Sequence, residues 1–390
     1  MNNIPFHKPY ITEDEISEVV DSLSSGWLTT GLKCVEFEKA FSQYIGCKHA
    51  IAVNSCTAAL HIALEAVGLR EGDEVITTPM TFAATAEVIR YFNAEPVFVD
   101  IEPDSMNINV SILEAKVKEH KSGGNRLKAI IPVHFAGHPC DMDSISTIAQ
   151  KNNLKVIEDA AHCLPAKYNN RQVGTIGDIT CFSFYATKNI TTGEGGMAVT
   201  DNSEWAERMR IMSLHGISKD AWKRYSEEGH WYYEIIAPGY KYNMTDIAAA
   251  LGIAQLKKAD FFQKRREEIA AQYNKAFKDL PQIIIPFESN NIQHSWHLYV
   301  MRLNLEYLSI DRNQFIEELR SRGVGTSVHF IPLHIHPYYR ETYGYKPEDF
   351  PVAYETFKKI ITLPLYPKMT DGEVRRVIEA VSDVATKFQK

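Results

Sequence analysis

The segment around Lys188 could supply a nucleophilic amine. The run at 178–196 reads DITCFSFYATKNITTGEGG, in which an apolar strand ends and one lysine follows in a loop of small residues rich in Thr and Gly. A lysine there is partly desolvated, and burial lowers the pKa of an amine because the ammonium form loses its hydration. The free amine attacks carbonyl groups, so Lys188 is a candidate for Schiff-base formation. On this segment alone, a solvent-exposed loop lysine is an equally good interpretation.

A carboxylate follows a second apolar strand. The run at 156–162, VIEDAAH, places Asp159 at the carboxyl end of that strand, where open α/β sheets bind ligands. Pyridoxal phosphate needs such a group, because its ring is an electron sink only while the pyridine nitrogen stays protonated. We expect Asp159 rather than Glu158 to face the crevice, since side chains alternate along a strand and small alanines follow. A helix N-cap is the alternative role for Asp159.

A third segment could bind an anion. At 54–60, NSCTAAL, a strand passes through small hydroxyl residues into a helix. Free N–H groups and the positive end of the helix dipole favour a phosphate there, and Thr57 adds a hydroxyl. Capping without a ligand is the commoner use of such a turn.

Other cofactor classes lack their sequence signatures. No G-x-G-x-x-G follows the first expected strand, and no G-x-x-x-x-G-K-[ST] occurs in the chain. His329, His334 and His336 are spread along an extended, proline-containing stretch, so we expect no metal site.

Composition narrows the class of partner. The 390 residues are 45% hydrophobic and 23% charged, which is typical of a globular protein, and 42 basic against 49 acidic side chains give a net charge of −7. We therefore expect no nucleic-acid partner. No secretory leader and no apolar stretch of about 18 residues is found, which predicts a cytoplasmic protein without a membrane span. The six cysteines form no C-x-x-C pair and are expected to be reduced and mostly buried.

The elements that must position these residues alternate through the first 250 residues. Thr12 with Glu15 predicts a capped helix that ends at Gly26. Strands are expected at 50–53, 74–77, 96–101, 129–135, 155–158, 179–184 and 197–200, with helices at 57–67 and 83–92. Several strands are apolar on both faces, which predicts a central sheet covered by helices on both sides and hence an α/β domain over residues 1–250.

The pattern changes after Asp246. Two helices at 247–256 and 261–277 come without a strand between them, and the charged run at 264–268 is expected to be a solvated helix face. Expected strands at 296–303 and 328–330, a helix at 312–322 and a final helix capped by Thr370 and Glu373 complete a smaller α+β domain over residues 251–390.

The set of motifs resembles the DegT/DnrJ/EryC1/StrS family of pyridoxal-phosphate-dependent nucleotide-sugar aminotransferases over nearly the whole chain. The matching runs, in order, are 26–31 (GWLTTG), 52–59 (AVNSCTAA), 72–76 (GDEVI), 132–137 (PVHFAG), 158–162 (EDAAH), 182–189 (FSFYATKN), 193–196 (GEGG), 238–243 (PGYKYN) and 328–329 (VH). The resemblance implies the fold-type I architecture, with a large mixed, mostly parallel sheet, a small C-terminal domain and active sites shared across a homodimer.

The resemblance also implies roles for individual residues. Lys188 matches the lysine that binds the cofactor and later moves the proton, and Asp159 matches the partner of the pyridinium nitrogen. The other cofactor contacts that it implies are Phe82 stacked on the ring, His162 beside the phenolic oxygen where many members have Gln, and Thr57, the Ala58 backbone, Ser183 and Asn243 of the neighbouring subunit around the phosphate. By the same analogy the substrate groove uses Thr29, Thr30, Lys33 and His329, although Lys33 could equally be an exposed lysine at a helix start.

The implied reaction takes the amino group from L-glutamate, releases 2-oxoglutarate, and adds the amine to the keto carbon of a nucleotide-linked keto-deoxy sugar. The runs at 185–188, 238–243 and 326–330 look most similar to members that aminate C4 for lipid A arabinose or surface glycans, which favours a UDP-linked 4-keto sugar. The alternatives are a lyase or dehydratase of the same fold, or a non-catalytic protein that binds a nucleotide sugar. Members that dehydrate sugars replace the lysine with His, and this chain keeps Lys188.

Overall fold

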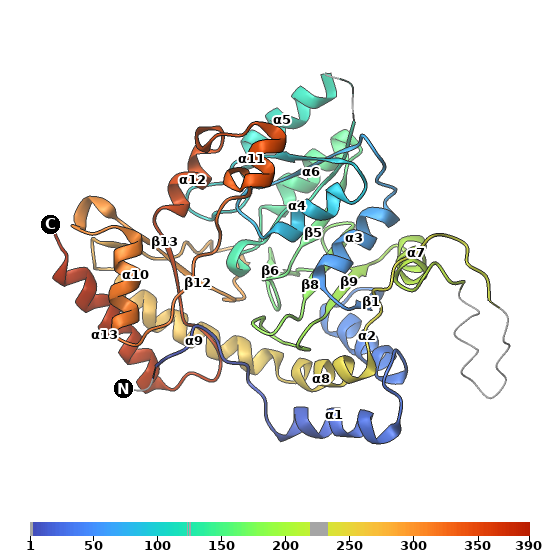
Figure 1. Cartoon of the computed structure of the whole chain (residues 1–390), viewed down its shortest axis with the longest axis horizontal. Helices are drawn as coiled ribbons and strands as arrows, with labels where there is room; N and C mark the ends of the chain where they lie inside the picture. Colours follow the sequence, from blue (N-terminus) through green and yellow to red (C-terminus); the bar gives the residue numbers. More distant parts are fainter. Residues whose placement is uncertain (1–2, 123, 125, 219–232) are drawn as a thin grey trace.

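A seven-stranded sheet forms the centre of the larger part of the molecule (Figure 1). The computed structural model describes residues 3–122, 124, 126–218 and 233–390. In spatial order the strands are β1 (His49–Val53), β9 (Gly196–Thr200), β8 (Ile179–Ser183), β5 (Lys155–Asp159), β4 (Leu127–Ile130), β2 (Glu74–Thr77) and β3 (Glu95–Phe98). Only β9 runs antiparallel to its neighbours. The predicted α/β class with a mixed, mostly parallel sheet is confirmed.

Helices cover both faces of this sheet because its strands are apolar on both sides. In β1, Ile51 and Val53 pack in one cluster with α3, whereas Ala50 and Ala52 pack in another with Phe37 of α2. The helices of this part are α1 (Glu13–Ser25), α2 (Leu32–Ile45), α3 (Cys56–Ala66), α4 (Ala83–Arg90), α5 (Val110–Ser122), α6 (Met142–Asn152), α7 (Ser203–Ser213) and α8 (Asp246–Leu256).

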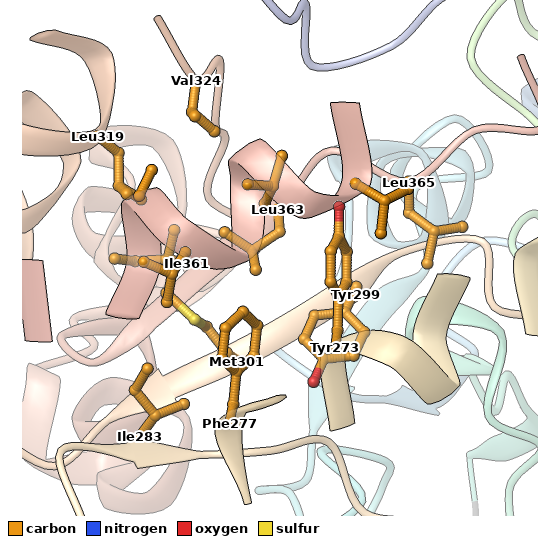
Figure 2. Packing of buried hydrophobic residues seen from close by; sticks show 14 of the residues in the cluster. Tyr273, Phe277, Ile283, Tyr299, Met301, Leu319, Val324, Ile361, Leu363 and Leu365 are labelled. Carbon is orange, nitrogen blue, oxygen red and sulfur yellow. The ribbon is translucent and has the colours of Figure 1, made fainter. Parts of the chain in front are cut away.

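A smaller antiparallel sheet supports the C-terminal part. It contains β10 (Ile283–Ile284), β12 (Tyr299–Leu303) and β13 (Ile360–Leu363), and it packs with α9 (Ala259–Phe277), α10 (Arg312–Ser321) and α13 (Asp371–Lys387). Figure 2 shows the core between them, in which Tyr273 and Phe277 of α9 lie against Tyr299 and Met301 of β12. Ile4 belongs to the same core and pairs with Val324, so the N-terminal segment lies on the C-terminal part.

The remaining elements link the two parts. α11 (Pro337–Tyr343) and α12 (Pro351–Phe357) lie on the side of α5 (Figure 1), and Tyr339 and Phe350 pack against Phe98 of β3.

A third small sheet has the order β11 (Ile292–Gln293), β6 (Lys167–Tyr168) and β7 (Arg171–Gln172). The predicted division at residues 250 and 251 falls inside α8, and it stays a prediction.

The first helix forms as its sequence predicts but leaves its apolar residues in solvent. Thr12 and Glu15 form the capping box of α1, and Gly26 ends the helix with a left-handed φ of 75°. Glu15 is buried and bonds Lys258, whereas Ile16, Val20 and Leu23 stay exposed.

Two expectations for the C-terminal part are wrong. Residues 328–330 form no strand, because only Ser327 pairs with Thr362 and the aromatic rings that follow pack toward the large sheet. The run at 264–268 is not a uniformly solvated face, since Arg266 is buried and its Nη1 donates to the carbonyl oxygens of Trp296, His297 and Leu365. Its hydrogen bonds to the buried carbonyl groups of two other segments offset the cost of burying this arginine.

Two further observations bear on the sequence predictions. None of the helices in the described ranges is long and apolar enough to cross a membrane. All six cysteines are free thiols, and five of them are buried, as expected.

Candidate functional site

The ends of β5, β8 and β1 lie at one edge of the large sheet. In the strand register Asp159 lies opposite Cys181, Ser183 lies opposite Gly196, and Gly196 lies opposite Val53. The loops that follow the three parallel strands therefore start next to one another. This edge is the ligand-binding edge of open α/β sheets.

Lys188 is held in the loop after β8. Its backbone N–H donates to the carbonyl oxygen of Tyr185 at 2.9 Å, and the Thr192 N–H closes the loop by donating to the carbonyl of Phe184 at 2.9 Å. Burial of the ammonium group, which the negative charge of Asp159 offsets only in part, lowers the pKa of Lys188 to about 8. This agrees with the desolvation expected from the sequence, and it makes the amine available near neutral pH.

Asp159 is buried, and both of its carboxylate oxygens are held. Oδ2 accepts a hydrogen bond of 2.7 Å from the Thr85 hydroxyl, and Oδ1 accepts one of 3.1 Å from the Ala161 N–H. The Thr85 hydroxyl gives its one proton to Asp159, so the Thr81 hydroxyl, 2.7 Å away, must donate to Thr85. Residues 160–166 form no helix, which rules out the N-cap alternative.

Glu158 has a different environment from its neighbour. Its Oε2 lies 2.8 Å from His134 Nε2, and its Oε1 accepts from the Gly177 N–H and the Thr180 hydroxyl, each at 2.7 Å. Glu158 and His134 are both fully buried. Burial would raise the pKa of Glu158, but the His134 partner and the other donors together lower it, so Glu158 is ionised. The Cys140 N–H donates to His134 Nδ1 at 3.0 Å, so His134 donates to Glu158 from Nε2 as a neutral ring. Asp159, not Glu158, is therefore the carboxylate held beside the Lys188 loop.

Two histidines and a phenylalanine lie around Lys188. The ring of His162 stacks on Phe330 with centroids 5.7 Å apart, and His329 lies next to Phe330 and bonds the Thr362 hydroxyl at 2.9 Å through Nδ1. Burial, with the positive charge of Lys188 added, lowers the pKa of His329 to about 4 and that of His162 well below its ordinary value. Both rings are neutral at physiological pH.

Phe82 offers an open aromatic face at the same edge. It is the N-cap residue of α4, its side chain is 64% exposed, and its ring centroid lies 6.2 Å from that of Phe330. Such an exposed ring can stack on a planar ligand.

The predicted anion site lies at the start of α3. Gly196 of β9 lies so close to this turn that a Cβ would come within 2.4 Å of the Ser55 carbonyl carbon, and Ser183 is the residue opposite Gly196 on β8. Ser55 caps the helix by accepting from the Ala58 N–H at 3.0 Å. A bound phosphate would have to share that N–H with the cap.

The remaining predicted residues gather around the start of α2. Asn243 donates to the Thr30 hydroxyl at 2.7 Å, Thr30 donates to the carbonyl of Met244, and the carbonyl of Thr29 accepts from the Asp246 N–H. Lys33 forms ion pairs with Glu18 at 2.8 Å and Asp21 at 2.9 Å, which raise the pKa of its ammonium group. The structure thus brings Thr29, Thr30, Lys33 and Asn243 into one group and places His329 with Lys188. Their predicted contacts with substrate and phosphate stay predictions.

The residues at the sheet edge fit pyridoxal phosphate. His162 Nδ1 is buried and has no hydrogen-bond partner among the residues that the structure describes, so a ligand oxygen would satisfy it. Lys188 supplies a desolvated amine, Asp159 a fixed carboxylate and Phe82 an exposed ring. When bound, the cofactor supplies the electron sink that stabilises a carbanion.

The sequence predictions did not include several residues that shape this site. Thr85 lies in the first turn of α4 and Thr81 just before the N-cap residue, and the four-residue spacing of the two hydroxyl groups was the available signal. His297 and Phe330 come from the C-terminal part, and no spacing relates them to Lys188.

Comparison with known proteins identifies the family. A sequence model of the DegT/DnrJ/EryC1/StrS aminotransferase family matches residues 9–382. The chain is 56% identical to an uncharacterized protein, MJ1066, of Methanocaldococcus jannaschii over 98% of both chains. It is 52% identical to the spore coat polysaccharide biosynthesis protein SpsC of Bacillus subtilis, over 98% of this chain and 97% of SpsC.

A solved structure agrees with this assignment. The PLP-form of the putative sugar aminotransferase Spr1654 of Streptococcus pneumoniae superposes with a TM-score of 0.90 at 37% identity, and the match covers 99% of each chain. Lys188 and Asp159 thus lie in a fold whose solved relatives include an enzyme in its pyridoxal-phosphate form. The chain belongs to the DegT/DnrJ/EryC1/StrS aminotransferase family and is a pyridoxal-phosphate-dependent sugar aminotransferase.

Proposed function

We propose that this aminotransferase moves the amino group of L-glutamate to C4 of a UDP-linked 4-keto-deoxy sugar in the cytoplasm, in a pathway that builds a cell-surface polysaccharide. The family membership and the similarity to SpsC, a spore coat polysaccharide biosynthesis protein, support the pathway. The runs at 185–188, 238–243 and 326–330 favour amination at C4 through the resemblance described above.

The observation that carries the proposal is the amine of Lys188 with its pKa lowered to about 8, in a site whose carboxylate is fixed. An amine with that pKa can accept a proton from the α-carbon of an amino donor and return it to the carbon being aminated. Asp159 can hold the proton of the ring nitrogen because two donors fix its orientation. The rings of His162 and His329 are neutral, so they add no positive charge that would lower the pKa of the amine further.

The substrate groove is part of this proposal. His329 lies near Lys188 and is the proposed contact to the sugar. Thr29, Thr30 and Lys33 are the proposed contacts to the nucleotide diphosphate. Since Lys33 is paired with Glu18 and Asp21, a diphosphate must compete with these two carboxylates for its ammonium group.

A homodimer would place the residues around the start of α2, which are Thr29, Thr30, Lys33 and Asn243, in the site of a partner subunit. Several large apolar side chains near the N-terminus are exposed, including Leu32 at 85%, and a second copy of the chain would bury them. These side chains are Ile16, Val20, Leu23, Trp27, Leu28, Leu32 and Val35. Sedimentation equilibrium should give twice the chain mass for the native protein and the chain mass for Leu32→Asp/Val35→Asp. Ile284→Asp, an exposed position on β10, serves as the control and should stay dimeric. A native protein that sediments as a monomer while active would contradict the shared site.

The activity is tested with glutamate and a panel of UDP-, dTDP- and GDP-linked keto sugars. We expect 2-oxoglutarate to form in step with an amino sugar, and NMR of the product to place the new nitrogen at C4 of the UDP-linked sugar. Turnover with another nucleotide, or nitrogen at C3, would contradict the substrate assigned here. Release of ammonia without 2-oxoglutarate would instead indicate a lyase.

A further inference from the structure

His297 lies against the loop that carries Lys188, although it comes from the segment that precedes β12. Its Nδ1 is 3.1 Å from Oδ1 of Asn189, the residue directly after Lys188. Both side chains are buried. Nδ2 of Asn189 donates to the carbonyl oxygens of Leu164 at 2.7 Å and Ser295 at 3.0 Å. One amide therefore ties the lysine loop to two other segments.

This arrangement determines which nitrogen of His297 carries its proton. Two carbonyl groups accept from Asn189, so the NH₂ end of the amide must face them and the oxygen must face His297. An amide oxygen only accepts, so Nδ1 of His297 has to be the N–H nitrogen and Nε2 is left with its lone pair.

The charges around His297 keep it in this neutral form. Burial lowers the pKa of His297 well below its ordinary value, and the positive charges of Lys188 and Arg266 lower it further. A neutral ring with one fixed N–H can hold the Asn189 amide without adding charge beside the lysine amine.

His297 also supports His162 on the other side of the site. The two ring centroids are 4.5 Å apart, and Ser295 of the same segment donates a hydrogen bond of 2.6 Å to the His162 carbonyl oxygen. Gly137 makes this contact possible, because a Cβ there would lie 2.0 Å from Ser295 Oγ and the residue has a φ of 101°. The segment 294–298 thus touches the turn after β5 and the loop after β8.

We propose that His297, as its Nδ1–H tautomer, is a positioning residue that holds the Lys188 amine and the His162 ring in place relative to the cofactor. It acts through the Asn189 amide on one side and through ring contact on the other. The proposal rests on attachment of the cofactor to Lys188.

Two substitutions of His297 separate positioning from folding. The amide nitrogen of Asn occupies the place of histidine Nδ1 and keeps the bond to Asn189, whereas the longer Gln side chain reaches the Nε2 position and loses that bond. We expect His297→Gln to lower kcat about tenfold, the effect of losing about one net hydrogen bond, with KM for glutamate changed less than about twofold. The pH midpoint of the visible band of the bound cofactor should also move, by about one unit. His297→Asn should keep both properties close to those of the native enzyme.

A matched control and an independent measurement complete the test. His294→Gln makes the same change three residues away, where the ring stacks on Trp296 rather than contacting Asn189, and it should leave the band's pH midpoint unchanged. If His297→Asn and His297→Gln titrate alike, the positioning role is wrong. Should either variant fail to fold, ¹⁵N NMR of the native cofactor-free protein decides, because a His297 that carries its proton on Nε2 or on both nitrogens overturns the proposal. A native enzyme that shows no visible band at all would instead contradict cofactor attachment to Lys188.

Discussion

The hydroxyl of Thr85 donates a hydrogen bond of 2.7 Å to Oδ2 of Asp159, and both residues are buried. The Thr81 hydroxyl in turn donates to Thr85 at 2.7 Å. Thr85 in the first turn of α4, with Thr81 just before that helix, therefore fixes the carboxylate that we propose as the partner of the pyridinium nitrogen. Hydrogen bonds to an ionised group are about twice as strong as those between neutral groups, so the two hydroxyls should differ in their effect.

Thr85→Val keeps the shape of the side chain and removes the donor. The loss of a hydrogen bond to a charged group costs about 1.5–3 kcal/mol, so we expect the Kd for pyridoxal phosphate to rise at least about tenfold and kcat to fall. Thr81→Val removes a neutral bond and should cost about 1 kcal/mol. Thr85→Ser, which retains the hydroxyl, is the control. Cofactor affinity is measured by fluorescence titration of the cofactor-free protein. Equal affinities for Thr85→Val and Thr81→Val would contradict the arrangement in which Thr81 donates to Thr85 and Thr85 donates to Asp159.

Removal of the nucleophile tests the role of Lys188 directly. Lys188→Ala and Lys188→Arg should both lose the visible absorption band of covalently held cofactor and nearly all turnover, because neither side chain offers a free amine at neutral pH. The arginine variant separates charge from nucleophilicity. Absorbance spectra and borohydride reduction followed by peptide mass spectrometry measure the link, and a reduced adduct on another lysine would refute the assignment.

The pKa of Lys188 predicts a pH dependence. Burial lowers this pKa to about 8 from 10.5, so the fraction of free amine rises with pH and levels off above about pH 9. The folded protein then binds fewer protons than the unfolded chain between about pH 8 and 10.5, so this group makes stability rise with pH in that window. Stopped-flow capture of pyridoxal phosphate by the cofactor-free protein should show a rate midpoint near pH 8. A midpoint near 10.5 would mean that the amine is solvated.

Local sequence patterns predicted most of the large sheet. Helix caps such as Thr12 with Glu15, and strands apolar on both faces such as β1, depend on neighbours in sequence, and they appear where expected. The failures involve distant segments. Arg266 reads as one charge in a solvated run, but its burial depends on carbonyl groups of Trp296 and Leu365, which lie far along the chain.

The same distinction applies to the site. Lys188 and Asp159 could be singled out because each follows an apolar strand, and parallel strands end at one edge of a sheet. His297 carries no comparable signal, since only the fold brings it to Asn189. Lys33 shows a further limit, because its ion pairs with Glu18 and Asp21 depend on how α1 and α2 both pack against α8.

The buried Glu158–His134 pair predicts a stability effect that is separate from catalysis. Glu158→Gln replaces a fully buried carboxylate, which accepts three hydrogen bonds, by a neutral amide whose NH₂ group can only donate. The loss of one hydrogen bond to a charged group costs about 1.5–3 kcal/mol. The pKa of Glu158 is lowered in the folded protein, so its contribution is present above the unfolded pKa and is lost as the pH falls through the folded value. Urea unfolding at pH 7 should show the full loss, and the difference from the native protein should shrink in acid. An unchanged difference at low pH would contradict an ionised Glu158.

A side chain at Gly196 should disturb the proposed phosphate site, because this residue packs directly against the backbone at the start of α3. A Cβ at this residue would meet the backbone of Ser55 and Cys56 at 2.4–2.6 Å, and backbone atoms cannot move aside as a flexible side chain can. Gly196→Ala must therefore push β9 away from the start of α3, at a cost of about 1–3 kcal/mol in stability. Because Ser183 is paired with Gly196, the same shift moves it away from the start of α3. Affinity for pyridoxal phosphate should then fall more than affinity for pyridoxal, which lacks the phosphate. Gly193→Ala, where a Cβ meets no atom within 4 Å but φ is 80°, is the matched control for backbone strain alone. Titration of both variants with the two ligands measures the difference, and an equal loss of affinity for both ligands in Gly196→Ala would place the phosphate elsewhere.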